Sequence, residues 1–552
     1  MKRPAHPDPY IAGVMLLSRI STQGRWGAEA ARKYNEETKH SYVSIRTAPG
    51  FLDFANKPYP FKYYVGGEKS QLPDDFWKPS EDALRALSCR GSESAAAKAL
   101  NTSLLSSLLY FTAGISRVER LGDRRVYFRV APATGALYST ELYTVVGEVE
   151  GVSPGVYHFD PGEFTLHRLR RGDYRGVVAR AAQDGGLSVS PVVIVFSAYG
   201  WRNAWKYRER SYRHWFWDGG AMLANSVAAV CSMGLNHRLF TGFVDEKLNE
   251  LIGVDGLDEA AYAVLAVGYK DGLGRFDSAD YGLGELEASP APQRGKPHRY
   301  WLVTETHTAT ALHSEGDVVT WREAVKQLED IGKDIRRLGI QTPMPGPATQ
   351  SKTLWETILL RGSTRRFSRK SIDASQLSTI LRHSFGPLNA DFLPSPNHTL
   401  IRPHLIVNNV DGVPSGAYSY DPSTGNLILL KKGHFREAAG YLCLEQPLGR
   451  DAAVVFFNMA DLDSVLRVLG GRGYRAVQLE GGIRLGRLYL SSYALGLGAT
   501  GLTFYDDDCV EFFSPSSEGL EMITVVAIGH PDYSAKPGKI FTRALTHPAK
   551  AF

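Results

Sequence analysis

Two stretches of the sequence share one pattern: "YRHWFWDGG", which begins at Tyr212, and "YRAVQLEGG", which begins at Tyr474. Both open with Tyr-Arg, close with Gly-Gly, and continue into a long apolar run that predicts a buried helix. A shift of 262 positions superimposes them, and the same shift brings Gly234 onto Gly496. Landmarks repeated in a nearly constant register predict that the chain folds as two copies of one unit.

Further landmarks extend the repeat upstream. "PGVYHFDP" around Tyr157 matches "SGAYSYDP" around Tyr418 at a shift of 261, and "RGS" at Arg90 matches "RGS" at Arg361 at a shift of 271. In each copy, early helices are followed by alternating strand patterns, a hairpin, the long helix and a last strand. This order predicts an α+β fold in which each copy has an antiparallel-rich sheet flanked by helices.

The repeat also predicts how the chain is divided. We expect an N-terminal extension at 1–75, a first copy at 76–285, a joining segment at 286–348 and a second copy at 349–552. The joining segment is Pro-rich at both ends and contains one predicted helix, from Trp321 to Leu338, so it reads as a spacer.

Composition excludes several classes of protein. Of 552 residues, 43% are hydrophobic and 22% are charged, which is typical of a globular protein. The net charge of +5 is not concentrated in any long basic run, so nucleic-acid binding is not expected. The apolar stretch from Tyr10 to Leu17 is too short to span a membrane, and we expect a cytoplasmic protein without a membrane partner.

The cysteines and acidic residues predict no metal site. Cys89, Cys231, Cys443 and Cys509 are far apart and none belongs to a CxxC pair, so neither a disulfide framework nor a zinc site is expected. The acidic run Asp506 to Asp508 lacks spaced ligands and is interpreted as a solvated turn.

Five segments together resemble a known group of enzymes. They are "YNEETKHS" at Tyr34, "RVAPATGALYSTELY" at Arg129, "PGVYHFDP" at Pro154, "WKYRERSYRHWFWDGG" at Trp205 and "GFVDEKLNELIGVDG" at Gly242. The sequence resembles the FMN nitroreductase superfamily and, more narrowly, the SagB/ThcOx-type dehydrogenases, which oxidise azoline rings to azoles. The resemblance implies α+β units that bind FMN where two subunits meet, here fused as an intrachain pseudo-dimer.

The string "RGSTRR", which begins at Arg361, is the candidate phosphate end of the FMN site. Arginine offers a planar fork that suits a phosphate. By the resemblance, Arg361 and Ser363 would hold the phosphate and Arg365 the pyrimidine edge of the flavin. The alternative is a solvated basic helix start. Among the basic residues after the last strand, Lys539 is the residue taken to close the site, with Lys536 and Arg543 as alternatives.

The first copy has lost part of this string. It keeps Arg90 and Ser92, but Ser94 stands where the second cation is expected and Glu93 adds a negative charge. A dianionic phosphate should therefore prefer the second copy. We expect one FMN per chain.

The resemblance also implies a loop that crosses from one copy to cover the flavin of the other. The residues of this loop taken to face the cofactor are Pro132, Ala133, Thr134 and Gly135. Ala133 stands where a serine is usual, so Thr134 is the candidate replacement for its hydrogen bond. Backbone groups of Thr500 and Gly501, after the long helix of the second copy, should face N5 of the flavin.

Lys206 and Tyr207 match the Lys-Tyr pair that acts as base and proton-handling partner in azoline dehydrogenases. A desolvated lysine can take a ring proton near neutrality, and a phenol can orient or relay it. The alternative is a surface lysine beside an aromatic cap. The second copy has no Lys-Tyr pair in the matching stretch, which contains Leu469 and Gly470, so each copy is expected to have kept the part of one composite site that the other lacks.

These observations predict an FMN-dependent dehydrogenase that aromatises a thiazoline or oxazoline on a peptide or carrier during natural-product biosynthesis, with oxygen reoxidising the flavin. A cyclodehydratase or other cyclising enzyme is the expected partner. Two alternatives stay open: an NAD(P)H-dependent nitro or quinone reductase, and a non-catalytic scaffold for a cyclising partner.

Overall fold

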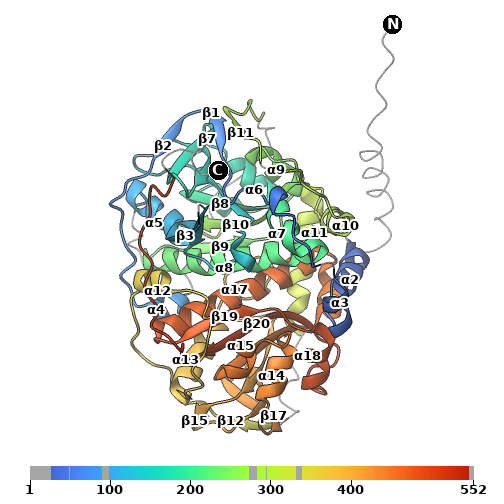
Figure 1. Ribbon diagram of the computed structural model, residues 1–552. Helices are drawn as coiled ribbons and strands as arrows, with labels where there is room; N and C mark the ends of the chain where they lie inside the picture. Colours follow the sequence, from blue (N-terminus) through green and yellow to red (C-terminus); the bar gives the residue numbers. More distant parts are fainter. Residues whose placement is uncertain are drawn as a thin grey trace.

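The computed structural model describes residues 27–48, 50–89, 99–122, 124–272, 282–293, 295–330 and 339–545. The apolar stretch Tyr10 to Leu17 and the partial phosphate string, Arg90, Ser92, Glu93 and Ser94, lie outside these residues. The two copies stack one above the other, with two long helices between their sheets (Figure 1).

Each copy contains a seven-stranded sheet with the same strand order. The first sheet runs β2 (Lys69–Gln71), β7 (Thr165–Arg171), β6 (Gly155–Asp160), β5 (Thr140–Val146), β8 (Val192–Tyr199), β10 (Glu259–Val267) and β9 (His237–Phe240). The second runs β12 (Ile340–Thr342), β17 (Asn426–Lys432), β16 (Gly416–Asp421), β14 (Arg402–Val407), β18 (Val454–Ala460), β20 (Glu521–Gly529) and β19 (Gly498–Leu502). Neighbouring strands in both sheets are antiparallel. The predicted fold class and duplication are confirmed.

Helices cover both sheets. Those before the joining segment are α2 (Ala28–Glu37), α3 (Tyr42–Thr47), α4 (Ala83–Ser88), α5 (Thr102–Ala113), α6 (Arg175–Ala181), α7 (Trp201–Tyr207), α8 (Ser211–Ser232) and α9 (Asp245–Ile252). Those of the second copy are α12 (Leu354–Leu360), α13 (Ala374–Ser384), α14 (Arg436–Leu442), α15 (Pro447–Asp451), α16 (Leu462–Leu469), α17 (Arg472–Ala494) and α18 (Asp506–Phe513). The smaller strand pairs are β1 (Tyr64–Gly66) with β11 (Ala288–Pro290), β3 (Ile115–Leu121) with β4 (Arg124–Arg129), and β13 (Ile372–Asp373) with β15 (Val410–Asp411).

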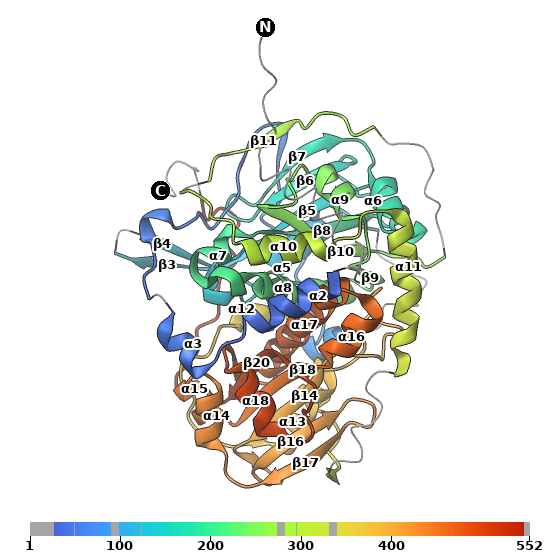
Figure 2. The same ribbon diagram turned by 90° about the vertical axis from the view of Figure 1, so that its right-hand side faces the viewer.

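The joining segment contains more regular structure than expected. It holds α10 (Trp301–Ala309) as well as α11 (Glu315–Val325), and α11 runs along the side of both copies (Figure 2). The end of the joining segment supplies β12, which is the edge strand of the second sheet. In the same way, β2 within the N-terminal extension supplies the edge strand of the first sheet. Each sheet therefore begins before the positions, 76 and 349, at which the copies were expected to start.

The Gly-Gly pair of the repeated pattern explains how α8 and α17 pack together. A Cβ added at Gly220 would lie 2.6 Å from the backbone of Gly482, and one at Gly482 would lie 2.5 Å from the carbonyl oxygen of Phe216. The first glycine of each pair faces its own sheet instead: Gly219 abuts Tyr262 and Gly481 abuts Ile523. The glycines thus let the two helices approach at backbone contact.

Replacing Gly482 with valine should destabilise the protein strongly. The new side chain would meet the backbone of α8, which cannot move aside as a flexible side chain can, and overpacking of this kind costs about 3 kcal/mol. Thermal unfolding should show the loss as a lower Tm. The control is Gly316→Ala in α11, where an added Cβ meets nothing nearer than 3.7 Å. Equal Tm values for the two variants would contradict the close helix crossing.

Buried ion pairs cross between the copies with the symmetry of a dimer. Asp245, at the start of α9, accepts from Arg475 (2.6 Å) and Arg472 (2.7 Å) of the second copy. Asp506, at the start of α18, accepts from Arg213 (3.1 Å) and Arg210 (3.0 Å), which precede or begin α8. The interpretation of Asp506 as part of a solvated turn is wrong, since its side chain is 1% exposed.

A disulfide joins Cys89 to Cys231, with Cα atoms 6.0 Å apart. No disulfide was predicted, because the cysteines are distant along the chain, but α4 packs on α8 and brings these two together. Cys443 and Cys509 are buried free thiols.

Candidate active site

A cavity of about 1710 Å³ lies between the copies and is lined by both. The first copy contributes the loop 132–136, the end of α7 and one face of α8; the second contributes the loop after α12, part of α17, and β19 with the residues that follow it. Residues 37–40 of the N-terminal extension also line it. The cavity thus brings together predicted site residues of both copies.

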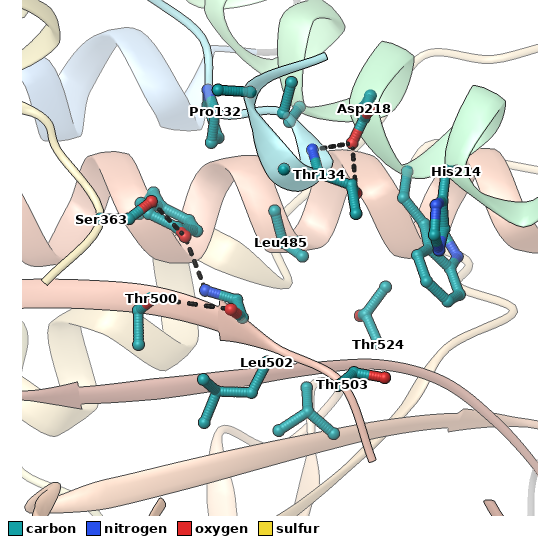
Figure 3. Close-up of a pocket in the computed structure, with 18 of the residues that line it drawn as sticks. Pro132, Thr134, His214, Asp218, Ser363, Leu485, Thr500, Leu502, Thr503 and Thr524 are labelled. Atoms are coloured by element: carbon teal, nitrogen blue, oxygen red, sulfur yellow. Dashed lines mark hydrogen bonds between the residues drawn. The ribbon is translucent and has the colours of Figure 1, made fainter. Parts of the chain in front are cut away.

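The loop 132–136 of the first copy crosses the cavity toward α17 (Figure 3). Thr134 donates to one carboxylate oxygen of Asp218 twice, from its backbone N–H and from its hydroxyl, both at 2.7 Å. Gly135 has a φ of 61°, and a Cβ there would lie 2.8 Å from the hydroxyl oxygen of Tyr207 and 3.5 Å from Nζ of Lys206. The crossing loop and the Lys-Tyr pair are therefore in direct contact, and glycine is required where they meet.

Lys206 and Tyr207 are the last two residues of α7, and both line the cavity. The prediction that Lys206 is desolvated is wrong for this structure, because the Lys206 side chain is exposed. Its ammonium lies 5.1 Å from the centre of the Tyr207 ring. His214 on α8 packs edge-to-face against the same ring, with centroids 4.3 Å apart.

The electrostatic surroundings keep Tyr207 protonated and His214 neutral. Burial raises the pKa of Tyr207 well above its ordinary value, and the carboxylate of Asp218 raises it further. Burial, together with Arg210, holds the pKa of His214 well below its ordinary value. Tyr207 therefore enters any reaction near neutral pH as a phenol that can donate a proton.

Basic side chains gather at the other end of the cavity, at the loop after α12. Arg361, Ser363 and Arg365 all line it, as predicted. Arg361 is 9% exposed and donates to the backbone carbonyls of Val130 (3.1 Å) and Arg129 (2.7 Å). Arg361 thus ties the second copy to the strand that leads into the crossing loop.

Arg361 is a buried cation. No carboxylate within the described ranges forms an ion pair with it, and burial lowers its pKa. Buried charges are normally paired, so this end of the cavity suits a bound anion. A phosphate with Ser363 and Arg365 beside it meets that requirement, and the residues present fit the phosphate of FMN.

Of the three basic residues after the last strand, Lys536 lines the cavity. Lys539 does not: its backbone N–H pairs with Ser116 (2.8 Å) and its side chain is exposed. Arg543 forms an ion pair with Asp74 at 3.0 Å. The choice of Lys539 is therefore corrected to Lys536, because residues 538–541 run along the first copy as an extended segment outside the cavity.

Thr500 and Gly501 line the cavity beneath the crossing loop (Figure 3). The backbone N–H of Gly501 donates to the hydroxyl of Tyr489 (2.6 Å), which also bonds the hydroxyl of Ser363 (3.2 Å). This N–H is thus already engaged, and Tyr489 on α17 connects Ser363 to the part of strand β19 that was expected to face the flavin.

The equivalent place in the first copy is filled by the chain itself. Leu239, the counterpart of Gly501, is fully buried, and its N–H donates to the carbonyl of Asn389 (3.0 Å). Asp391 then accepts from the backbone N–H groups of Thr241 (2.8 Å) and Gly242 (2.9 Å). Trp321 of α11 closes over Gly242, where an added Cβ would lie 2.5 Å from its ring. The segment 389–391 and α11 therefore pack directly against the residues of the first copy that follow the counterpart of Gly501.

Sequence reasoning missed three residues that shape the cavity: Asp218, His214 and Tyr489. A signal for Asp218 was present, because the repeat places it opposite Glu480 in the second copy. Glu480 holds a loop in the same way, accepting from Thr399 (2.6 Å) and from the N–H of Leu400 (2.8 Å). An acidic residue kept at the centre of both long helices therefore indicates a side chain that holds a loop by hydrogen bonds.

Away from the cavity, Asp160, Glu163 and His167 place one possible ligand atom each within 4.8 Å of one another. Lys69 forms an ion pair with Glu163, so an ammonium group already supplies positive charge there. We assign no metal to this cluster.

The chain is similar to proteins described as nitroreductases. One from Methanocaldococcus jannaschii is 26% identical over 185 residues, which span 33% of this chain and 89% of that protein. The crystal structure of one from Anabaena variabilis matches with a TM-score of 0.72 and 26% identity, over 91% of this chain and 99% of that chain. The second match thus extends over both copies.

The Escherichia coli microcin synthetase McbBCD complex with truncated pro-MccB17 matches with a TM-score of 0.24 and 16% identity, over 48% of this chain and 94% of that chain. That score carries no functional argument. No protein-family model matches the chain. No helix among the described residues has the length and apolar character to cross a membrane. Together, the comparisons support a nitroreductase-like oxidoreductase fold.

Proposed function

We propose that this chain, which has a nitroreductase-like fold, is an FMN-dependent dehydrogenase that oxidises a thiazoline or oxazoline ring to the azole. The observation that carries the proposal is the meeting in one cavity of the Lys206–Tyr207 pair and crossing loop of the first copy with the unbalanced Arg361 of the second. Neither copy alone contains both parts.

Arg361, Ser363 and Arg365 would hold the phosphate of FMN, and Lys536 would close that end. The crossing loop, through Pro132, Ala133 and Gly135, would lie over the flavin ring opposite Thr500. FMN supplies, when bound, the acceptor for the hydride that leaves the azoline ring. Because the counterpart space in the first copy is filled, the proposal includes one FMN per chain.

The residues of the first copy carry the proton chemistry. Aromatising the ring removes one proton and one hydride from it, and Lys206 would take the proton. Its exposure in the protein alone gives it access to an entering ring, and a bound substrate would desolvate it. Tyr207, held as a phenol, would orient the ring or relay the proton.

The size of the cavity supports a substrate larger than a single small ring. Pockets for drug-sized ligands are about 300–1,000 Å³, and this cavity exceeds that range at about 1710 Å³. Room remains for a cofactor together with a ring borne on a peptide or carrier. Such a ring arises by cyclodehydration of Cys, Ser or Thr, so a cyclising enzyme would act beforehand.

The test is to incubate the purified flavoprotein with thiazoline- and oxazoline-bearing peptides and measure their masses. The expected product has lost two hydrogens per ring. Rapid bleaching of the flavin by NAD(P)H, without any azoline oxidation, would favour a nitro or quinone reductase instead. If the purified protein had no flavin spectrum and could not take up FMN, the non-catalytic scaffold would be the remaining candidate function.

A further inference from the structure

The acidic residue at the centre of each long helix has different surroundings in the two copies. Glu480 in α17 is paired with Arg484, whose nitrogens lie 2.8 and 2.9 Å from one carboxylate oxygen. Asp218 in α8 has Met222 at the position corresponding to Arg484, and no cation within the described ranges pairs with it. The two acids hold loops in the same way, but only Glu480 has its charge compensated.

An uncompensated buried carboxylate is costly. Asp218 is 4% exposed, and burial raises its pKa to about 6. Its hydrogen bonds come from Thr134 and from the side-chain amide of Asn203 on α7 (3.2 Å). Asp218 therefore connects the crossing loop to the helix that ends in Lys206 and Tyr207.

We infer that Asp218 is a positioning residue, which latches the crossing loop through Thr134 and so sets the loop against Lys206 and Tyr207. The inference rests on the proposed function for its link to turnover, but the latch itself is a structural claim. The contact that it fixes is close: at Gly135 there is no room for even a methyl group beside the hydroxyl of Tyr207.

The Asp218→Asn variant removes the negative charge but keeps the hydrogen bonds that hold the loop, so it tests the two contributions separately. An asparagine oxygen can still accept both hydrogen bonds from Thr134. Asn203, whose side-chain oxygen is buried without a partner, can turn its amide to accept from the new NH₂ group. Asp218→Ala removes the acceptor altogether, and Thr134→Val removes only the hydroxyl donor at a residue that lines the cavity.

With the FMN-loaded protein, Asp218→Ala should lower kcat by about 10- to 100-fold, the effect of a small misplacement of reacting groups. In the Asp218→Ala variant, the backbone N–H of Thr134 should exchange with solvent deuterium faster than in the unmodified protein. Thr134→Val should show a smaller loss of kcat, and Asp218→Asn should recover most of the turnover and the amide protection. Glu480→Gln, the matched control, should lower Tm while leaving kcat unchanged, because it unpairs Arg484 and neither residue lines the cavity.

Thermal stability provides a further test. If Asp218 only stabilised the fold, its replacement should lower the Tm, whereas the cost of burying its charge predicts that the Tm does not fall. A carboxyl group whose pKa is raised on folding weakens the folded state progressively as the pH rises from the unfolded-state pKa to the folded-state pKa, and the loss is complete above the latter. The titratable groups facing Asp218 are Tyr138 near the loop, Tyr207 on α7 and Tyr262 on β10, and none of these phenols ionises in this range. At pH 8, Asp218→Asn should therefore have a Tm equal to or above that of the unmodified protein.

Unchanged amide exchange and kcat in Asp218→Ala would overturn the latch, as would an Asp218→Asn variant as impaired as the alanine variant. If the unmodified protein turns over no azoline, the proposed function fails while the latch is still decided by deuterium exchange at Thr134. The visible circular dichroism of bound FMN, which the loop would cover, gives a second readout independent of turnover.

Discussion

Replacing Lys206 with alanine should lower azoline turnover by about 10²- to 10⁴-fold, the usual contribution of a general base, while FMN content stays unchanged. The two effects should separate because the Lys206 ammonium lies beside the crossing loop and Tyr207 of the first copy, whereas Arg361 belongs to the basic loop after α12 of the second copy. Tyr207→Phe should reduce turnover less, since the ring and its packing on His214 remain. Turnover and the flavin absorbance of each purified variant are the measurements.

Arg361→Ala is the reciprocal variant. Charge-assisted hydrogen bonds to an anion are worth about 1.5–3 kcal/mol each, so FMN affinity should fall by about 10- to 100-fold. Lys539→Ala is the control, because this lysine is exposed outside the cavity and should affect neither FMN nor turnover. A Lys206→Ala variant that loses FMN and turnover in parallel would refute the assignment of base and phosphate clamp to separate copies.

The duplication could be predicted because the repeated pattern contains the residues that decide the packing. The Gly-Gly pairs permit the crossing of α8 with α17, and the Tyr-Arg pairs supply one arginine to each of the two buried carboxylates of the crossed ion pairs. Such residues tolerate little change, so their register survived divergence. A constant register was therefore a sound guide to the fold.

The parts of the site that could not be predicted depend on contacts between distant segments. The carbonyl of Asn389 meets the N–H of Leu239 across the two copies, and no local pattern signals this contact. The same holds for the Cys89–Cys231 disulfide, which depends on how α4 packs against α8. Asp218 was recognisable only as a repeated acid, because its lack of a cationic partner is a property of the folded protein.

Mutation of the crossed ion pairs tests directly how much they stabilise the packing of the two copies. Asp245→Ala should lower the free energy of unfolding by about 3–5 kcal/mol, because it leaves Arg472 and Arg475 buried without a counter-charge. Asp506→Ala should cost a similar amount through Arg210 and Arg213. Scanning calorimetry and urea unfolding would measure both.

Acid should weaken the same pairs in the unmodified protein. Burial alone would raise the pKa of Asp245, but Arg472 and Arg475 outweigh it and hold that pKa well below its ordinary value. Asp506 is lowered in the same way by Arg210 and Arg213. A carboxyl group with a lowered pKa in the folded state contributes its full stabilisation above the unfolded-state pKa and loses it as the pH falls toward the folded-state value. The Asp245→Ala variant should therefore lose less stability on acidification below about pH 4 than the unmodified protein.

Asp507→Ala is the matched control for these pairs. Asp507 is the residue that the 262-position shift places opposite Asp245, yet its side chain is 74% exposed, and it pairs at the surface with Lys39 (3.0 Å). An exposed pair contributes at most about 1 kcal/mol. If Asp507→Ala proved as damaging as Asp506→Ala, the assignment of Asp506, at a shift of 261 positions, as the counterpart of Asp245 would be wrong, and with it the symmetry of the buried pairs.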